Sequence, residues 1–215
     1  MKYFLILSIA IFFFSCSSAT LVDSWKNPEI ESYEPVKILV VGLTPNKNVR
    51  HQFETQLQEE FELRGFEATR SVYYFENTLT SEEQLKALEY QLLSEGFDTI
   101  LFTKTIGIEN KILYKKNFDS YNETITRFKE DYLKYQDIYF NPEYYNEYKV
   151  YHAETAMYCI CPTKERELIW KSYIDITDPQ DVDVTVSDYV KLVIAALDAE
   201  QLINPIAKDK KTSTN

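Results

Sequence analysis

Hydrophobic and polar positions change their spacing along the chain, and each change predicts a new element. The run VKILVVGL at 36–43 is continuously apolar and rich in β-branched residues, which is typical of a strand buried on both faces. In the next segment the apolar residues recur at every fourth position, which predicts an amphipathic helix: Val49, Phe53, Leu57 and Phe61. Asn46 or Asn48 can cap the start of this helix, and Gly65 can end it.

The same succession of strand and helix then repeats. EATRSVYYF at 67–75 reads as a second strand, and the segment 80–96 reads as a second helix that ends at its glycine. Capping-box spacing marks the start of this helix, and leucines form its apolar stripe: Thr80 with Glu83 or Ser81 with Gln84, then Leu85, Leu88 and Leu92. DTILFTKTIGIE at 98–109 reads as a third strand. Together these elements predict a right-handed βαβαβ unit.

Two further strands and one further helix follow at the end of the chain. The apolar stretches at 151–161 and 167–177 are separated by the short polar turn PTKER, which predicts a β-hairpin. The last helix carries one apolar face, made of Val186, Val190, Val193, Ile194 and Leu197. We therefore predict one α/β domain over residues 36–205: a βαβαβ unit extended by an antiparallel hairpin and a C-terminal helix, in a two- or three-layer sandwich. We expect the polar tail at 206–215 to be disordered.

The first residues have the layout of an export signal. Lys2 precedes a twelve-residue apolar run, followed by small residues, so we expect 1–15 to be a signal peptide. As a helix this run would span about 18 Å, which is shorter than the roughly 30 Å hydrocarbon core of a bilayer. FFSC at 13–16 resembles a lipobox with phenylalanine in place of the usual aliphatic residue, which predicts lipidation of Cys16. The alternative is an ordinary signal peptide cut near Ala19. Residues 16–35 are polar and aperiodic, and we expect them to be a lipidated tether.

The charge of the chain restricts its partners. The formal net charge is −11 and the sequence pI is about 4.8. An acidic chain is poorly suited to nucleic acid or to electrostatic docking on anionic lipid, so we expect no nucleic-acid partner.

The remaining cysteines form a Cys-X-Cys pair. Cys159 and Cys161 would share one face of a strand, with their Cα atoms at about 6.5–7 Å, the upper edge of disulfide geometry. We therefore favour two small buried apolar residues, and we leave their oxidation state open.

Motifs of catalysis and cofactor binding are absent from the sequence. The turn GLTPNKN at 42–48 has one glycine and lacks a phosphate-binding pattern. His51 and His152 lack a second ligand at metal spacing, although His152 and Glu154 would share one strand face. Arg50 and Glu54 have the spacing of an ion pair on a helix. We expect no catalytic residue, no metal and no cofactor.

An insertion at 114–150 is the best functional candidate. Residues 114 to 151 hold nine of the chain's seventeen tyrosines. Tyrosine combines a flat apolar ring with a hydroxyl, which suits interfaces and stacking on sugar rings. We predict that partners bind through four of them: Tyr139, Tyr144, Tyr145 and Tyr148. The alternative is that these rings only pack the insertion against the sheet.

The first half of the chain resembles small uncharacterised bacterial envelope lipoproteins, with motifs of low specificity over residues 13–110. The matching residues are Trp25, Pro28, Arg50, Phe53, Glu54, Leu57 and Gly65. The resemblance implies an α/β fold of the kind found in periplasmic accessory modules near secretion or assembly machinery, with no catalytic residues. We therefore expect a lipid-anchored binding or assembly module of the cell envelope, in the outer membrane and facing the periplasm, with envelope proteins or glycans as partners. An enzyme or binder acting on envelope glycans is the alternative from another class, and a purely structural lipoprotein is a third.

Overall fold

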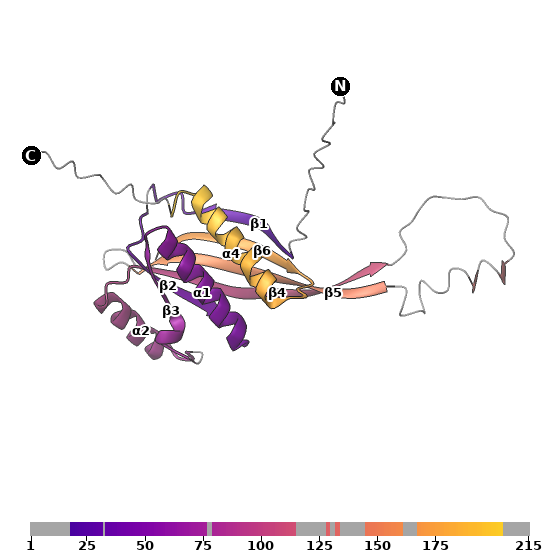
Figure 1. Ribbon diagram of the computed structural model, residues 1–215, viewed down its shortest axis with the longest axis horizontal. Coiled ribbons are helices and arrows are strands. Elements are labelled where there is room, and N and C mark those ends of the chain that lie inside the picture. Colours follow the sequence, from indigo (N-terminus) through magenta and orange to yellow (C-terminus); the bar gives the residue numbers. More distant parts are fainter. Residues whose placement is uncertain are drawn as a thin grey trace, which may run out of the picture.

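The chain folds into a mixed α/β sandwich, as the sequence predicts. The computed structural model describes residues 18–31, 33–76, 79–114, 128–129, 132–133, 145–160 and 167–203. Six strands form one sheet in the order β1-β6-β5-β4-β2-β3 (Figure 1). The strands are β1 (Ala19–Lys26), β2 (Lys37–Leu43), β3 (Glu67–Arg70), β4 (Thr99–Tyr114), β5 (Tyr145–Cys159) and β6 (Leu168–Thr177). The main helices are α1 (Lys47–Leu63), α2 (Glu82–Ser94) and α4 (Val182–Ala199).

The predicted βαβαβ unit is present. β2 lies between β3 and β4 and pairs parallel with both, so that Ile38 is level with Ala68 on one side and with Thr99 on the other. The second strand is shorter than predicted, because the chain leaves the sheet after Arg70 and forms the 3₁₀ turn η1 (Ser71–Tyr73). The side chain of Glu54 holds this turn, as described below.

The predicted helix ends are confirmed. The Asn46 side chain accepts hydrogen bonds from the backbone N–H groups of Asn48 and Val49 at the start of α1. Ser81 and Gln84 form the capping box of α2. Gly65 follows α1 with a φ of 87°, a left-handed conformation that glycine adopts without steric cost.

Helices cover the two faces of the sheet unequally. α1 and α4 pack beside each other on one face, over the larger core that contains Phe53, Leu57 and Trp170. α2 packs on the β2 side of the other face through Leu92, which joins a smaller core with Leu39. Among the described residues, no helix is long and apolar enough to cross a membrane.

The stretch expected to be a tether contains a strand. β1 pairs antiparallel with β6 from Ala19 to Lys26, with one irregularity between Leu21 and Asp23, and Ala19 at its start is only 5% exposed. The Trp170 indole Nε1 donates a hydrogen bond to the Ser24 hydroxyl at 2.9 Å. β1 lies at the edge of the sheet, where most of its side chains face water, so its sequence lacks the apolar pattern of an inner strand.

The strands on either side of the Tyr-rich insertion are longer than predicted. β4 and β5 stay paired out to Tyr114 and Tyr145, whereas β6 pairs with β5 only from Val150 onward. The outer part is therefore a two-stranded projection, which we call the arm: residues 110–114 of β4 with 145–149 of β5. It extends beyond the rest of the sheet (Figure 1). The insertion between the strands lies outside the described residues, apart from 128–129 and 132–133.

Cys159 is buried, as expected, and the structure answers the question of its oxidation state, which the sequence left open. This residue is disulfide-bonded and 1% exposed. Cys16 and Cys161 lie outside the described residues.

Candidate functional site

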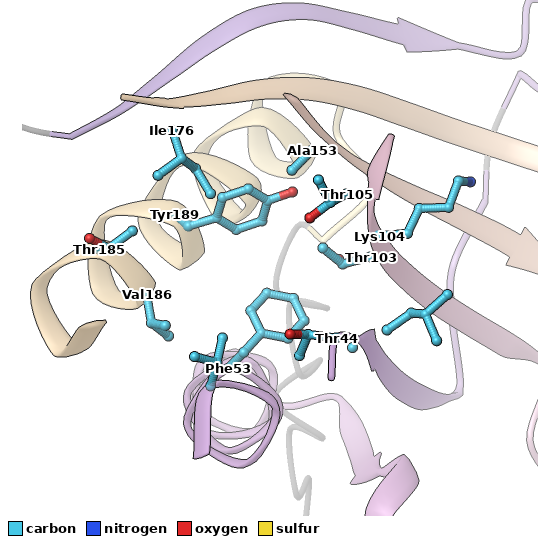
Figure 2. A pocket seen from close by; sticks show the side chains of 13 residues that line it. Thr44, Phe53, Thr103, Lys104, Thr105, Ala153, Ile176, Thr185, Val186 and Tyr189 are labelled. Atoms are coloured by element: carbon cyan, nitrogen blue, oxygen red, sulfur yellow. The ribbon is translucent and has the colours of Figure 1, made fainter. Parts of the chain in front are cut away.

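A pocket of about 140 Å³ opens between α1 and α4, at the carboxyl end of β2 and beside residues 103–105 of the neighbouring strand β4 (Figure 2). This edge of parallel strands is where open α/β sheets commonly bind ligands. We call the cavity the α1–α4 pocket. It is lined by Gly42, Leu43, Thr44, Val49, Phe53, Thr103, Lys104, Thr105, Ala153, Ile176, Thr185, Val186 and Tyr189.

Two aromatic rings form the walls of the pocket. Phe53 from α1 and Tyr189 from α4 meet edge to face, with ring centroids 5.9 Å apart. Gly42 lets the end of β2 approach this wall, because a Cβ there would lie 3.0 Å from the Phe53 ring. Ala153 on β5 has only a methyl group, which leaves space beside the Tyr189 ring (Figure 2). The pocket therefore results from small residues of the sheet facing large residues of the helices.

The polar groups around Tyr189 are neutral hydroxyls that are already paired. The Tyr189 hydroxyl lies 2.9 Å from the Thr155 Oγ1, which lies 2.7 Å from the Thr103 Oγ1. Burial raises the pKa of Tyr189 to about 12, so its ring stays uncharged at neutral pH.

The cation near the pocket is engaged elsewhere. The Lys104 amine lies 2.6 Å from a Glu154 carboxylate oxygen, and the side chain points away from the pocket centre (Figure 2). The lining therefore offers apolar contact and hydroxyl groups.

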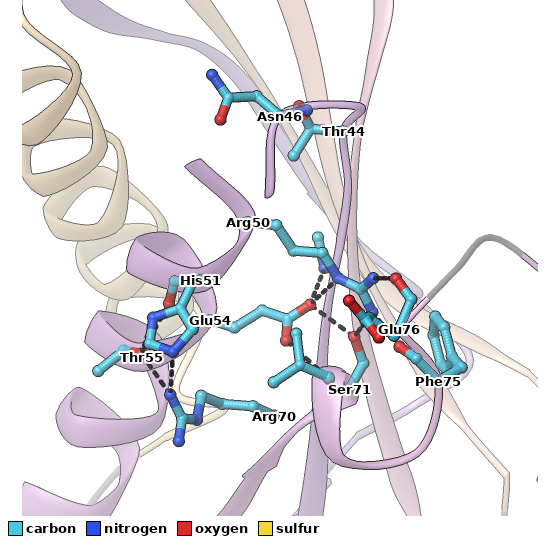
Figure 3. Close-up of polar contacts among 12 residues, drawn as sticks. Thr44, Asn46, Arg50, His51, Glu54, Thr55, Arg70, Ser71, Phe75 and Glu76 are labelled. Atoms are coloured by element: carbon cyan, nitrogen blue, oxygen red, sulfur yellow. Dashed lines mark hydrogen bonds and ion pairs between the residues drawn. The ribbon is translucent and has the colours of Figure 1, made fainter. Parts of the chain in front are cut away.

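A buried polar network fixes α1, and with it one wall of the pocket (Figure 3). Glu54 is fully buried, and its Oε1 accepts hydrogen bonds from the Arg50 Nε at 2.9 Å, the Gly42 N–H at 3.0 Å and the Ser71 hydroxyl at 2.6 Å. Its Oε2 accepts from the Val72 N–H at 3.2 Å. These bonds join α1 to the end of β2 and to η1.

The arginine of the network has its own partners. The Arg50 guanidinium donates to the carbonyl oxygens of Phe75 and Glu76, both at 3.0 Å. It also lies 4.9 Å from the centre of the Phe75 ring. The ion pair predicted from the Arg50–Glu54 spacing is confirmed. Its burial was not predicted, because Ser71 and Val72 come from a distant segment.

The two histidines lie apart from the pocket. His51 is exposed on α1, with its Nε2 3.4 Å from the Arg70 Nη1. His152 on β5 has its Nδ1 2.6 Å from an Asp175 oxygen and its Nε2 3.6 Å from a Glu109 oxygen. Among the described residues, no three histidine, cysteine or carboxylate side chains are arranged to hold a metal ion.

The sheet face opposite α1 and α4 carries a second candidate group of side chains. The Lys171 amine lies 5.7 Å from the centre of the Trp25 ring and 5.4 Å from that of Tyr173. A hydrogen bond with Tyr173 raises the pKa of Lys171 and keeps the amine charged. We call this group, which joins β1 to β6, the Trp25 cluster.

Of the four predicted partner-binding tyrosines, the structure describes the side chain of Tyr148 only, and it lies outside both sites. Tyr148 lies half-buried in the arm, opposite Lys111 in the strand register. The backbone of Tyr145 begins β5, whereas Tyr139 and Tyr144 lie outside the described residues, as does Cys16. Tyr189 and Thr185, which line the pocket, were not predicted from the sequence. Tyr189 lies three residues after Val186 on the apolar face of the last helix, so its position was a usable signal.

Comparisons with known proteins give a likeness of structure only. No protein family matches the chain, and no curated protein matches it in sequence. The PelC dodecamer from Paraburkholderia phytofirmans is 13% identical, with 83% of this chain and 96% of that chain covered and a TM-score of 0.42. Lipoprotein GNA1162 from Neisseria meningitidis is 14% identical, with 78% and 98% covered and a TM-score of 0.37.

Proposed function

We propose that the protein is a lipid-anchored binding module of the bacterial cell envelope, which holds an apolar group of an envelope partner in the α1–α4 pocket. The observation that carries this proposal is the lining of the pocket. Two aromatic walls and small sheet residues enclose about 140 Å³, and the nearby hydroxyls are neutral. Such a cavity favours an apolar side chain or a short hydrocarbon.

The start of the folded chain lies beside this pocket, which supports a role at the membrane. The Ser18 hydroxyl lies 3.2 Å from the Thr185 Oγ1, and Thr185 lines the pocket. Cys16 is two residues earlier, so a lipid on this residue would tether the protein at the pocket end of the sheet. A partner in the same membrane could then reach the pocket directly.

The first strand favours processing before Cys16 over processing near Ala19. The Ser18 carbonyl accepts a hydrogen bond from the Thr177 N–H at 2.7 Å, and Ala19 is buried against the sheet. A cut after Ala19 would remove both contacts and leave backbone groups of β6 without a partner. A cut before Cys16 leaves β1 whole. This supports the lipoprotein interpretation, for which we propose an outer-membrane location facing the periplasm.

Photo-crosslinking in native membranes tests the proposal. A photoreactive phenylalanine analogue replaces Thr44, which is half-buried at the pocket. The matched control carries the same analogue at Leu63, which is 80% exposed at the opposite end of α1. We expect a defined crosslinked partner from position 44 that is absent from position 63. The same crosslinks at both positions, or none at position 44, would contradict a binding role for the pocket.

The Trp25 cluster supports a second candidate, the binding of envelope glycans. An aromatic ring beside a cation suits stacking on a sugar ring with a hydrogen bond to its hydroxyls. We expect Trp25→Ala to reduce retention of the protein on isolated cell-wall glycan. Tyr90→Ala, which removes a ring that is 74% exposed on α2, should leave that retention unchanged. Equal retention of the parent and both variants would exclude this second function.

A further inference from the structure

The arm exposes large apolar side chains on both of its faces. Ile112 and Leu113 are 55% and 56% exposed. Successive residues of a strand point to opposite faces, so these two side chains lie on opposite sides of the arm. Ile106 and Ile108, near the base of the arm, are 50% and 59% exposed. Two strands alone cannot bury such residues, and an isolated hairpin is marginally stable in water.

The base of the arm lies at the same end of the sheet as Ser18, the first residue before β1. The Ser18 carbonyl pairs with the Thr177 N–H, and Thr177 is level with Val150 in the register of β5 and β6. The arm starts one residue beyond Val150. Figure 1 shows the start of β1 and the base of the arm at the same end of the sheet.

The tip of the arm can reach a membrane in which Cys16 is anchored, because the chain from Cys16 to Ser18 is shorter than the arm. Cys16 precedes Ser18 by two positions, so this lead spans at most about 7 Å. The five residues of each arm strand extend about 17 Å. A lipid on Cys16 would therefore keep the base of the arm closer to the bilayer surface than the arm is long.

The charge of the arm differs from that of the whole chain. The arm contains two lysines, Lys111 and Lys149, and one acidic residue, Glu147. Its formal net charge is therefore +1, whereas that of the whole chain is −11. Although the protein as a whole is acidic, anionic lipid headgroups would not repel the arm. Its lysines have long stems that can reach headgroups while the neighbouring apolar residues lie deeper.

We propose that the tip of the arm inserts into the lipid interface beside the anchor, with Ile112 and Leu113 among the acyl chains. This inference rests on the proposed lipidation of Cys16. The two-sided exposure favours lipid over a protein surface. A flat protein surface or an added strand would leave Ile112 or Leu113 in water, whereas lipid surrounds the tip.

Quenching by brominated lipid tests the insertion. The full-length lipidated protein is reconstituted into phosphatidylcholine vesicles with or without bromine on the acyl chains, as the parent, Ile112→Trp, Leu113→Trp and Leu63→Trp. The native indoles report the background, because Trp170 is fully buried and Trp25 lies six residues from Ala19 along β1. Flotation with the vesicles is measured on the same samples.

We expect both arm variants to lose most of their added emission on brominated lipid, while the parent and Leu63→Trp keep theirs. If the proteins float but the arm variants keep their emission, the insertion is refuted and the anchor stands. A blue-shifted but unquenched emission also refutes it and points to a protein partner, such as a second copy of the chain. If the parent fails to float, the anchoring itself fails, and this inference fails with it.

Discussion

Removal of the Glu54 side chain is expected to cost far more stability than its position on a helix suggests. Glu54→Ala leaves the Arg50 guanidinium without its carboxylate and the N–H groups of Gly42 and Val72 without an acceptor. Breaking a buried ion pair at one partner costs about 3–5 kcal/mol. Each buried donor left unpaired costs about 1–3 kcal/mol, part of which the first figure already includes. We therefore expect a loss of about 3–5 kcal/mol in the free energy of unfolding.

Urea unfolding followed by tryptophan fluorescence measures this loss, with Glu60→Ala as the matched control. Glu60 on α1 pairs at the same spacing with Arg64, the residue that caps the end of the helix, but the Glu60 side chain is 38% exposed. Surface pairs contribute about 1 kcal/mol or less. In the double variant Arg50→Ala with Glu54→Ala, the loss should fall short of the sum of the two single losses by about 1 kcal/mol or more. Equal losses for Glu54→Ala and Glu60→Ala would refute the reasoning.

Two further predictions concern the pocket and a helix end. Burial raises the pKa of Tyr189 to about 12, so between pH 10 and 12 the unfolded chain loses this proton before the folded chain does. The free energy of unfolding should therefore fall over that range, and Tyr189→Phe should make its decline with pH shallower; an unchanged slope would contradict the burial argument. Gly65→Ala should cost about 1 kcal/mol because of the positive φ, whereas Gly107→Ala, whose Cβ would meet His152 at an ordinary 3.6 Å, should cost less. Equal melting temperatures for these two variants would contradict the strain argument.

The parts of the fold that the sequence predicts are those with a local pattern. The stripes of α1 and α4 follow from their own spacing, and Asn46 and Gly65 mark helix ends by their own chemistry. β1 has no such pattern, because it is an edge strand and gains its stability from backbone pairing with β6. The arm was not predicted for a related reason. In this part of β4 and β5 the strands continue through backbone pairing with each other, not through burial of their side chains.

The candidate site depends on contacts between distant segments, which one sequence does not display. The walls of the pocket come from Phe53 and Tyr189, which are far apart in the chain and meet only when α1 and α4 pack on the same face. The network around Glu54 likewise needs η1 to replace the end of a predicted strand. The Tyr-rich insertion was chosen from its composition. Composition shows which side chains are frequent, but it does not show where they lie in the structure.

Mass spectrometry of the protein purified from bacterial membranes tests the central claim most directly. We predict that the mature chain begins at Cys16 and carries the mass of a diacylglycerol on that residue. We also predict that Cys16→Ser abolishes labelling with an alkyne analogue of palmitate. A mature chain that begins near residue 20 without added mass would contradict lipid anchoring.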